Sequence, residues 1–399
     1  MEVEGLLSEL GSLDFFRRKK AMEGLLPAPE DSYLPFIEKA IRDGENATLR
    51  NAAIEFYRML GTRALPSLTA LVRDEDEDVR VFAVTLLGDI GATAPHDGAT
   101  APHDGATSPH DGATSPHDIA ATALRDAVND PDVNVRIAVA EAFGKTGDTE
   151  TVVDLARMLD DAPWVAMAAI KSIGEIGGPG ALDALYACLE KKPQYKGMLF
   201  EAIEKAGDRN SIRTLTPFVE KDDLRPLALK AIVNIALREK ARPAPPYFAS
   251  LAPLLMELRT SPDAELRKSA FIALGWSEDL RGLPCLIDGL RDEELQEHAI
   301  AGITGLGKRA VPAVIDALRD TERPQRYVLA RLLSMMGEHR ALVRFAEDRD
   351  AEVRVEVALA LSRLPSEKAI HLLSTLLKDP EPEVRDAARR AVETLNAGI

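Results

Sequence analysis

The sequence has few residues of the kinds that disulfide-linked, secreted or membrane-spanning proteins need. Only two of its 399 residues are cysteines, Cys188 and Cys285. Each lies in an apolar helical stretch, so we expect two buried, reduced thiols and no disulfide framework. No run of about 18 apolar residues is present, as a membrane-spanning helix would require. The first residues also lack the basic start and apolar run of a secretory signal. These features favour a cytoplasmic protein.

Strand patterns and aromatic residues are also scarce. No run alternates between apolar and polar residues with turns at both ends, so we expect no β-sheet. Aromatic residues make up only 5% of the chain, whereas apolar residues make up 46%. The core therefore consists mainly of Ala, Leu, Val and Ile, as closely packed short helices require. The sequence predicts an all-α protein.

Positive charge is in short supply. The chain has 49 Lys and Arg against 65 Asp and Glu, which gives a net charge of −16. Such a chain repels nucleic acid and anionic membranes unless a local patch reverses the sign. The one dense basic run, residues 17–20, is interpreted as a solvated helix face. We therefore expect no nucleic-acid or membrane partner, and instead a protein with a basic surface or segment.

The sequence does contain a repeat. Residues 350–364, DAEVRVEVALALSRL, show its signal: an acid, then Val-Arg, then an amphipathic helical stripe. Eight of the ten steps between successive copies are 28 to 31 residues long, which indicates a repeat array. Counted at the arginine or the residue in its place, the full and weaker copies fall at Arg50, Arg80, Arg136, Ala166, Lys196, Arg225, Arg267, Gln296, Arg326, Arg354 and Arg385.

Each repeat reads as a helical hairpin. In residues 310–337, Pro312 suits the first turn of a helix with an apolar stripe, because its missing N–H needs no partner there. A polar break and a second stripe follow, and Gly337 offers a left-handed cap. Two such helices cannot bury both apolar faces alone, so neighbouring hairpins must stack. The sequence predicts a right-handed α-solenoid of about 12 stacked hairpins.

The arginine of the signal predicts a second feature. A cation in the first turn of a helix opposes the helix dipole by roughly 0.3–1 kcal/mol when it is exposed. An acid four residues earlier and another from the adjacent unit would offset this cost, so we predict a ladder of Asp–Arg contacts along one edge. The alternative is a set of local, exposed pairs that contribute little. The predicted ladder residues are Asp76, Arg80, Asp132, Arg136, Asp263, Arg267, Asp350, Arg354 and Arg385.

These motifs resemble a known family. An Asp-x-x-(Val/Leu)-Arg start, an alanine-rich middle and a Leu-Gly ending are similar to HEAT repeats, specifically the short type named from phycobilisome lyases. Leu87-Gly88 and Leu274-Gly275 carry this ending here. The resemblance covers nearly the whole chain and implies an α-solenoid. It also leaves open, as an alternative function, a bilin lyase or a lyase subunit.

Two segments interrupt the period. Four near-identical heptapeptides, GATAPHD or GATSPHD, fill residues 91–118 and contain His96, His103, His110 and His117. With Gly and Pro in every copy they should form a flexible loop, and their removal should leave thermal stability nearly unchanged. We interpret the copies as a tandem duplication; weak metal capture by the histidines is the alternative.

A Pro-rich insertion marks the second interruption, and it either bends the stack or separates two half-arrays. The expected organisation is N-terminal repeats with a capping hairpin (1–91), the heptapeptide loop (92–118), central repeats (119–240), the Pro-rich insertion (241–250) and C-terminal repeats (251–399).

No motif for catalysis or cofactor binding stands out. The glycine run 174–180 follows no strand and lacks the Gly-Lys-Ser/Thr of a phosphate loop. In HEAT-repeat deoxyhypusine hydroxylases, His-Glu pairs hold two irons; the nearest pairs here, Glu297-His298 and Glu338-His339, have the reverse order. We therefore predict a non-catalytic scaffold without cofactor, metal or catalytic residues, which binds a protein along a concave face. Candidate partner-binding anchors are Trp164, Trp276 and Tyr327; gap-filling in the core is their alternative role.

Overall fold

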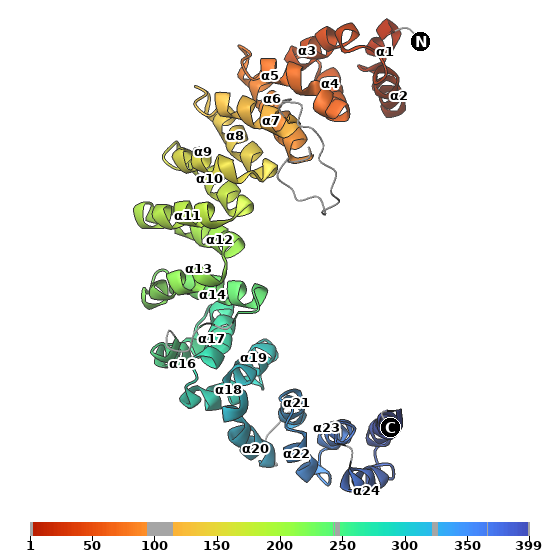
Figure 1. Ribbon diagram of the computed structural model, residues 1–399, viewed down its shortest axis with the longest axis vertical. Helices are drawn as coiled ribbons and strands as arrows, with labels where there is room; N and C mark the ends of the chain where they lie inside the picture. The colour runs from red at the N-terminus through yellow and green to blue at the C-terminus, as the bar shows by residue number, and fades with distance from the viewer. Residues whose placement is uncertain are drawn as a thin grey trace, which may run out of the picture. The chain divides into compact units, whose positions relative to one another are not determined.

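The protein is built only from helices and turns wherever its structure is described. The computed structural model describes residues 3–93, 115–241, 243, 248–320, 326–364 and 366–397, and these residues form no strand. They divide into two compact units, Met1–Gly207 and Asp208–Ile399. Within each unit, helical hairpins stack in chain order (Figure 1). The predicted all-α solenoid of stacked hairpins is thus confirmed.

Each hairpin has a first and a second helix, and the described residues form 12 such pairs. In the first unit these are α1 (Val3–Glu9) and α2 (Phe15–Leu25), α3 (Leu34–Arg42) and α4 (Ala47–Leu60), α5 (Leu65–Leu71) and α6 (Glu77–Thr93), α7 (Pro116–Asp126) and α8 (Val133–Thr146), α9 (Val152–Met158) and α10 (Pro163–Ile176), and α11 (Pro179–Lys191) and α12 (Lys196–Ala206).

In the second unit the pairs are α13 (Arg209–Leu215) and α14 (Arg225–Arg238), α16 (Ala252–Glu257) and α17 (Ala264–Trp276), α18 (Leu283–Gly289) and α19 (Gln296–Leu306), α20 (Val311–Arg319) and α21 (Arg326–Met335), α22 (His339–Leu342) and α23 (Ala351–Leu361), and α24 (Glu367–Leu376) and α25 (Pro382–Ala397).

Side chains of the repeat signal start the second helices. The Asp132 carboxylate accepts hydrogen bonds from the backbone N–H groups of Asn134 and Val135, and Asp263 does the same for Glu265 and Leu266. These bonds satisfy donors that have no partner inside the helix. The acid of the repeat signal is therefore a helix cap.

Glycines let neighbouring second helices approach closely. A Cβ atom at Gly88 of α6 would lie 2.7 Å from the Cβ of Ala142 in α8, and one at Gly174 of α10 would lie 2.8 Å from Ala202 in α12. Such separations are shorter than van der Waals contact, so only glycine fits. The Leu-Gly pair that suggested a helix end lies inside α6, which continues to Thr93. Its role there is close packing.

This close packing gives each unit two unlike layers. The second helices α6, α8, α10 and α12 pack against one another in sequence, more closely than the first helices α7, α9 and α11 do. Figure 1 shows α9 and α11 in one layer and α10 and α12 in the other. In the second unit, α14, α17 and α19 likewise pack together, as do α21, α23 and α25. Tighter spacing on one side curves a stack toward that side.

The N-terminal hairpin differs from the expected cap. Asp14 caps α2 by accepting hydrogen bonds from the N–H groups of Phe16 and Arg17. An end hairpin should have a polar outer face. The structure instead exposes Leu13, Phe15 and Phe16. That part of the prediction is wrong, because these side chains precede or open the helix and only Ala21, Met22 and Leu25 reach the core.

The division between units is not at the Pro-rich insertion. It falls between Gly207 and Asp208, one hairpin earlier. Across the insertion, α14 packs directly against α17, so the layer of second helices continues there. Residues 242 and 244–247 of the insertion lie outside the described residues.

Both ends of the heptapeptide segment belong to helices. α6 extends through Gly91 to Thr93, and Ser115 caps α7, which begins at Pro116. The side chain of His117 is only 2% exposed, and its Nδ1 lies 3.2 Å from the carbonyl oxygen of Gly91. The loop predicted for residues 92–118 is therefore wrong at its ends, because Ser-Pro is also a helix start. Residues 94–114 lie outside the described part.

The described ends together make one complete heptapeptide. Residues 91–93 supply GAT and residues 115–118 supply SPHD, so the 21 residues between them amount to three further copies. One copy thus serves the fold. His117 is packed between Gly91 and Asp148, whose Oδ2 lies 3.7 Å from its Nε2.

Two expectations from composition also have structural outcomes. Cys188 in α11 and Cys285 in α18 are buried free thiols, as predicted, and burial raises the pKa of both. Among the described helices, none has the length and apolar character needed to cross a bilayer.

Two deletions separate the structural copy from the additional ones. Removing residues 94–114 leaves one GATSPHD copy, and we expect the melting temperature to stay nearly unchanged. Removing residues 91–118 takes away the cap of α7 and buried His117. Loss of a cap alone costs about 1 kcal/mol of folding free energy. A loss of 1 kcal/mol lowers the melting temperature of a domain of this size by roughly 2–4 °C. We therefore expect the melting temperature to fall by several degrees. Calorimetry of both variants measures the difference; equal melting temperatures would contradict the assignment.

Candidate partner-binding surface

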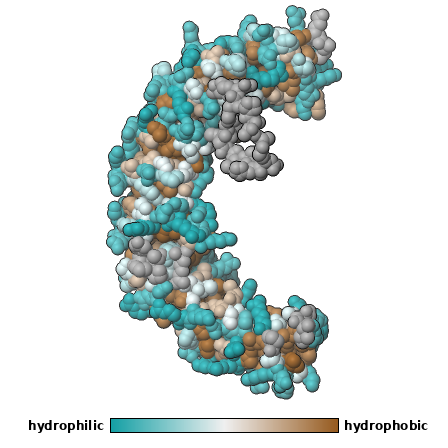
Figure 2. Space-filling model, in the orientation of Figure 1, coloured by the Kyte–Doolittle hydropathy of each residue, from teal (hydrophilic) through white to brown (hydrophobic). Residues whose placement is uncertain are grey.

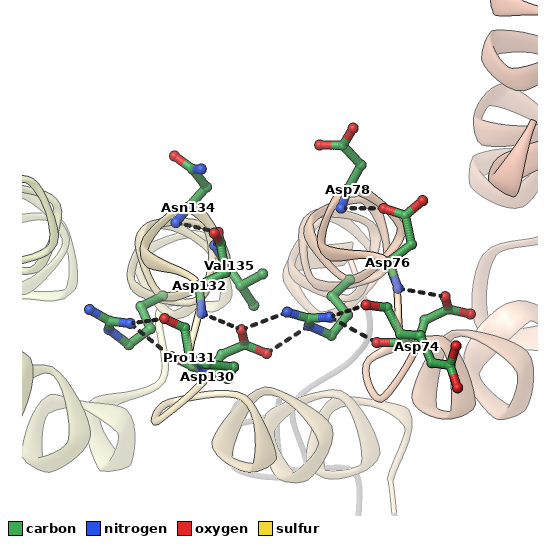
Figure 3. A network of polar contacts seen from close by, with 11 residues as sticks. Asp74, Asp76, Asp78, Asp130, Pro131, Asp132, Asn134 and Val135 are labelled. Carbon is green, nitrogen blue, oxygen red and sulfur yellow. Dashed lines mark hydrogen bonds and ion pairs between the residues drawn. The ribbon is translucent and has the colours of Figure 1, made fainter. Parts of the chain in front are cut away.

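Arginines of the repeat signal connect each hairpin to the next. The Arg80 guanidinium in α6 donates from Nε to Asp130 Oδ2 at 2.8 Å and from a terminal nitrogen to Asp130 Oδ1 at 3.0 Å. Its other terminal nitrogen donates to the carbonyl oxygen of Asp74 at 2.9 Å. Asp130 precedes α8, so the Arg80 side chain joins its own hairpin to the next one. Figure 3 shows this network, with Asp130 between the starts of α6 and α8.

The same pattern continues as a relay. Arg136 donates to both carboxylate oxygens of Asp161, at 2.7 and 2.9 Å, and to the carbonyl oxygen of Asp130 at 2.7 Å. Asp130 therefore receives one arginine on its side chain and the next on its backbone. Because the carboxylate contacts are bidentate and mostly shielded from water, they are stronger than ordinary surface pairs.

The second unit has an equivalent run. Arg326 is buried and pairs with Asp348 at 2.6 and 2.7 Å, and Arg354 pairs with Asp379 at 2.8 Å through two bonds. Arg354 also donates to the carbonyl oxygen of Asp348 at 2.7 Å. Arg385 ends the run by donating to the carbonyl oxygen of Asp379 at 2.6 Å.

The acids in these contacts are not those the sequence suggested. Asp76, Asp132, Asp263 and Asp350 cap their own helices and make no ion pair with the arginine four residues later. Their geometry prevents it, because a capping carboxylate faces the backbone N–H groups. The pairing acids stand two residues before the caps or at the preceding turn: Asp130, Asp161, Asp348 and Asp379. Three of them, Asp130, Asp348 and Asp379, stand six residues before an arginine of the repeat signal. That spacing is the sequence signal that would have predicted them.

One predicted rung is weak. Arg267 hydrogen-bonds the carbonyl oxygen of Ser261 at 2.8 Å, in the usual way. Its acid partner in the next hairpin is Glu294, at 3.5 Å, and that carboxylate is mostly exposed. The ladder is therefore a local feature of several neighbouring hairpins in each unit.

Pairing lowers the pKa of two ladder acids, Asp161 and Asp379. The hydrogen bonds from Arg136 hold the pKa of Asp161 below its ordinary value against the opposing effect of burial. Those from Arg354 do the same to the pKa of Asp379. Both carboxylates are thus held in the charged form by the preceding hairpin.

The three candidate aromatic anchors occupy different surroundings. Trp276, at the end of α17, is only 7% exposed and packs edge-to-face on Phe248, with ring centroids 5.4 Å apart. It fills the core. Tyr327 in α21 is half-buried. Trp164, the second residue of α10, is 68% exposed. Only Trp164 has the exposure of a docking residue.

Comparison between hairpins shows that Trp164 is unusual for its position. It directly precedes buried Val165, as Asp78 precedes buried Val79 and Asn134 precedes buried Val135. Figure 3 shows Asp78 and Asn134 pointing away from the ladder. Gln194, Glu265, Glu352 and Glu383 hold this position in other hairpins. A tryptophan thus replaces a polar residue at an exposed site where it has no helix-capping role.

The surface leading to Trp164 is acidic. We call it the acidic edge: Glu75, Asp76, Glu77 and Asp78 at the start of α6, Asp132 and Asn134 at the start of α8, and Trp164 at the start of α10. Within the described part of the chain, none of its five acids forms an ion pair. Carboxylates at helix starts are stabilised by the helix dipole, which explains how they tolerate one another. They leave negative charge on the two second-helix starts that precede α10, where the exposed ring of Trp164 lies.

Apolar residues form no continuous strip on the visible face of either unit. Figure 2 shows hydrophilic residues over much of this face, interrupted by separate apolar areas. A ligand of this surface would therefore meet isolated apolar side chains among charges. Charge and a few anchors decide recognition on such a surface.

The two Glu-His pairs do not come together. Glu297 and His298 lie in α19, whereas Glu338 and His339 lie at the start of α22. In the described residues no three His, Cys, Asp or Glu side chains are grouped as metal ligands.

Sequence comparison identifies the repeat. The model of HEAT repeats matches residues 121–204 and 311–393. The chain contains HEAT repeats in both matched regions. The narrower phycobilisome-lyase type is not shown by these matches, so the resemblance holds at the level of HEAT repeats. No curated protein matches the sequence.

Solved structures with the same fold include Kap121p in several states. Kap121p bound to Ste12p has a TM-score of 0.54 and 14% identity, over 98% of this chain and 48% of that one. Kap121p bound to Pho4p has a TM-score of 0.55 and 14% identity, over 99% of this chain and 49% of that one. Kap121p alone has a TM-score of 0.56 and 14% identity, over 98% of this chain and 48% of that one. The HEAT-repeat chain described here spans about half the length of these structures. At this identity the likeness concerns the fold.

Replacement of a ladder arginine should destabilise the HEAT repeats around it. Arg354→Met leaves the nearly buried carboxylate of Asp379 and the carbonyl of Asp348 without their donor, which we expect to cost about 2–3 kcal/mol. Arg389→Met is the matched control, because Arg389 and its partner Asp386 are both exposed. That change should cost less than about 0.5 kcal/mol. Urea unfolding measures both, and equal losses would show that the ladder adds nothing.

The ladder should also make stability depend on pH in the acid range. The folded pKa of Asp379 is depressed, so its contribution is complete above the unfolded pKa of about 3.9 and is lost as pH falls toward the folded pKa. Stability of wild type should therefore drop below about pH 4. In Arg354→Met the drop should be smaller. Urea midpoints measured from pH 7 to pH 3 test this, and parallel curves for the two proteins would contradict it.

Proposed function

We propose that this HEAT-repeat protein is a non-catalytic scaffold that binds a basic segment of a partner protein along the layer of second helices, beginning at the acidic edge. The observation that carries the proposal is Trp164, which is 68% exposed at a position where most other hairpins have acidic or amide side chains. An exposed tryptophan adds hydrophobic surface to water without stabilising its helix. A partner that covers it would recover that cost.

Charge indicates the kind of partner. Five unpaired acids lie on the two helix starts before Trp164, and the whole chain carries a net charge of −16. Lysine or arginine side chains would be attracted to this edge, and one of them could stack on the indole ring, which attracts cations. The acids and the indole ring, which lie on successive second helices, both favour a cationic protein segment over an anionic ligand.

The fold is compatible with this use. Kap121p, with the same fold at 14% identity, has been crystallised bound to Ste12p and to Pho4p. We propose a comparable use of the second-helix layer here, on the concave side of the stack in the first unit. Cytoplasmic location, absence of a cofactor and absence of catalysis remain part of the proposal. The alternative, a bilin lyase or lyase subunit, has no support from the matched family.

Binding of a labelled arginine-rich peptide tests the proposal. We expect Trp164→Ala to weaken binding by about 30-fold, because a central aromatic anchor is worth about 2 kcal/mol or more. The control is Val153→Ala, which removes an exposed apolar side chain from the first helix of the same hairpin. Its affinity should match wild type.

Two further measurements make the outcome decisive. Melting temperatures of both variants should equal that of wild type, since both side chains are mostly exposed. Equal affinity for Trp164→Ala and wild type would refute the role of this edge. A shift in the absorption of an added bilin, without peptide binding, would favour the lyase instead.

A further inference from the structure

A second surface, in the other unit, has the opposite charge. Between the first helices of the last two hairpins lies an open cleft with a volume of about 680 Å³. α22 covers only four residues and continues as a three-residue 3₁₀ turn, Val343–Phe345, whereas α24 has ten residues. The short, broken helix does not fill the space that a full first helix would occupy against α24. The cleft is therefore a consequence of how this hairpin folds.

Cations line this cleft from both sides. Arg340 and Arg344 come from α22 and the turn that follows it, and Arg363 and Lys368 lie across from them at the end of α23 and the start of α24. All four are exposed. Within the described residues none of them makes an ion pair with an acid. Glu347 is the acid in the lining. We call this surface the basic cleft.

The cations of the basic cleft differ from the nearby ladder arginines. The neighbouring ladder residues Arg326 and Arg354 are each neutralised by an aspartate. Arg363 also acts on Glu356: burial raises the pKa of that carboxyl, and Arg331 and Arg363 oppose the rise. In a chain of net charge −16, four cations around one hollow reverse the local sign. Such a patch attracts anions despite the charge of the whole protein.

The rest of the lining distinguishes between anions. Val343, Leu361, Leu364 and Leu372 give the cleft apolar walls. None of the lining residues is aromatic, so nucleic-acid bases would have no ring on which to stack. A second hollow of about 600 Å³ shares Ala346 and Glu347 and continues past the end of α24. Its lining includes Lys378 and two acids, Asp348 and Asp379, that the ladder arginines neutralise. The surface is thus long enough for an extended segment with both apolar and negative side chains.

We propose that the basic cleft binds an acidic peptide segment of another protein, with carboxylates facing Arg340, Arg344, Arg363 and Lys368 and apolar side chains against Val343 and Leu372. This inference goes beyond the proposed function, because it concerns a different unit and a ligand of opposite charge. It depends on charge complementarity and on the mixed lining of the cleft.

The test uses the full chain and a labelled peptide that alternates glutamate with leucine. The variant Arg344→Glu/Lys368→Glu reverses one cation on each side of the cleft. We expect it to weaken peptide binding at least tenfold, or about 1.4 kcal/mol, because two attractive contacts become repulsive. The matched control is Arg291→Glu/Lys308→Glu, which changes the net charge equally. Both control side chains are exposed in the same unit and form no ion pair there within the described residues. Its affinity should fall less than about threefold.

Two more ligands test the class of partner. A peptide that alternates glutamate with serine should bind at least about tenfold more weakly than the leucine peptide, because it leaves the apolar walls uncovered. Single-stranded DNA should bind more weakly still. Equal losses in the two double variants, equal binding of the two peptides, or tighter binding of DNA would each overturn the proposal. Unchanged melting temperatures for both double variants are expected, and they exclude misfolding as a cause of lost binding.

Discussion

One interaction joins several neighbouring hairpins in each unit, the arginine that two successive hairpins share. Each ladder arginine leaves the first turn of a second helix, where its charge alone would be unfavourable. It is stabilised there by a carboxylate from the next hairpin and by a carbonyl group from its own turn, as Arg354 is by Asp379 and Asp348. The Asp379 carboxylate also accepts a hydrogen bond from the backbone N–H of Glu381, at the start of the next second helix. The same aspartate therefore orders its own turn and binds the arginine of the preceding hairpin.

Glycine complements the arginine on the same layer. Where Gly88 and Gly174 face Ala142 and Ala202, the second helices approach too closely for any side chain. The ladder holds the helix starts, and these contacts hold the helices further along. Positions that take part neither in the Asp–Arg ladder nor in these close glycine contacts are free to vary between hairpins. Trp164 and the cations of the basic cleft are at such positions, so they are the places where function can differ from repeat to repeat.

Much of this fold was predictable because its signals are local. A period of about 30 residues, helix caps and paired apolar stripes lie within single repeats, and they gave the solenoid and its hairpins. Pairing partners were harder to predict, since Arg136 meets Asp161 only after two hairpins stack. Burial was harder still. Trp276 and Trp164 look alike in sequence, yet Phe248 covers one and solvent surrounds the other.

The heptapeptide segment shows a further limit of reasoning from composition. Gly, Pro and His predict a loop whichever copy is considered, because the copies are nearly identical. The last copy meets Asp148 and the end of α6, so its serine caps a helix and its histidine is buried. A heptapeptide whose composition predicts a loop can therefore supply a helix cap and a buried side chain.

Opposite charges on the two candidate surfaces bear on partner choice. The acidic edge lies in one unit and the basic cleft in the other, and each has unpaired charges of a single dominant sign within the described residues. A segment attracted by one is repelled by the other, so charge alone keeps two ligands from exchanging sites. Apolar groups beside each charge cluster then select among segments of the right sign. A scaffold made of near-identical repeats can in this way distinguish two partners without a separate domain for each.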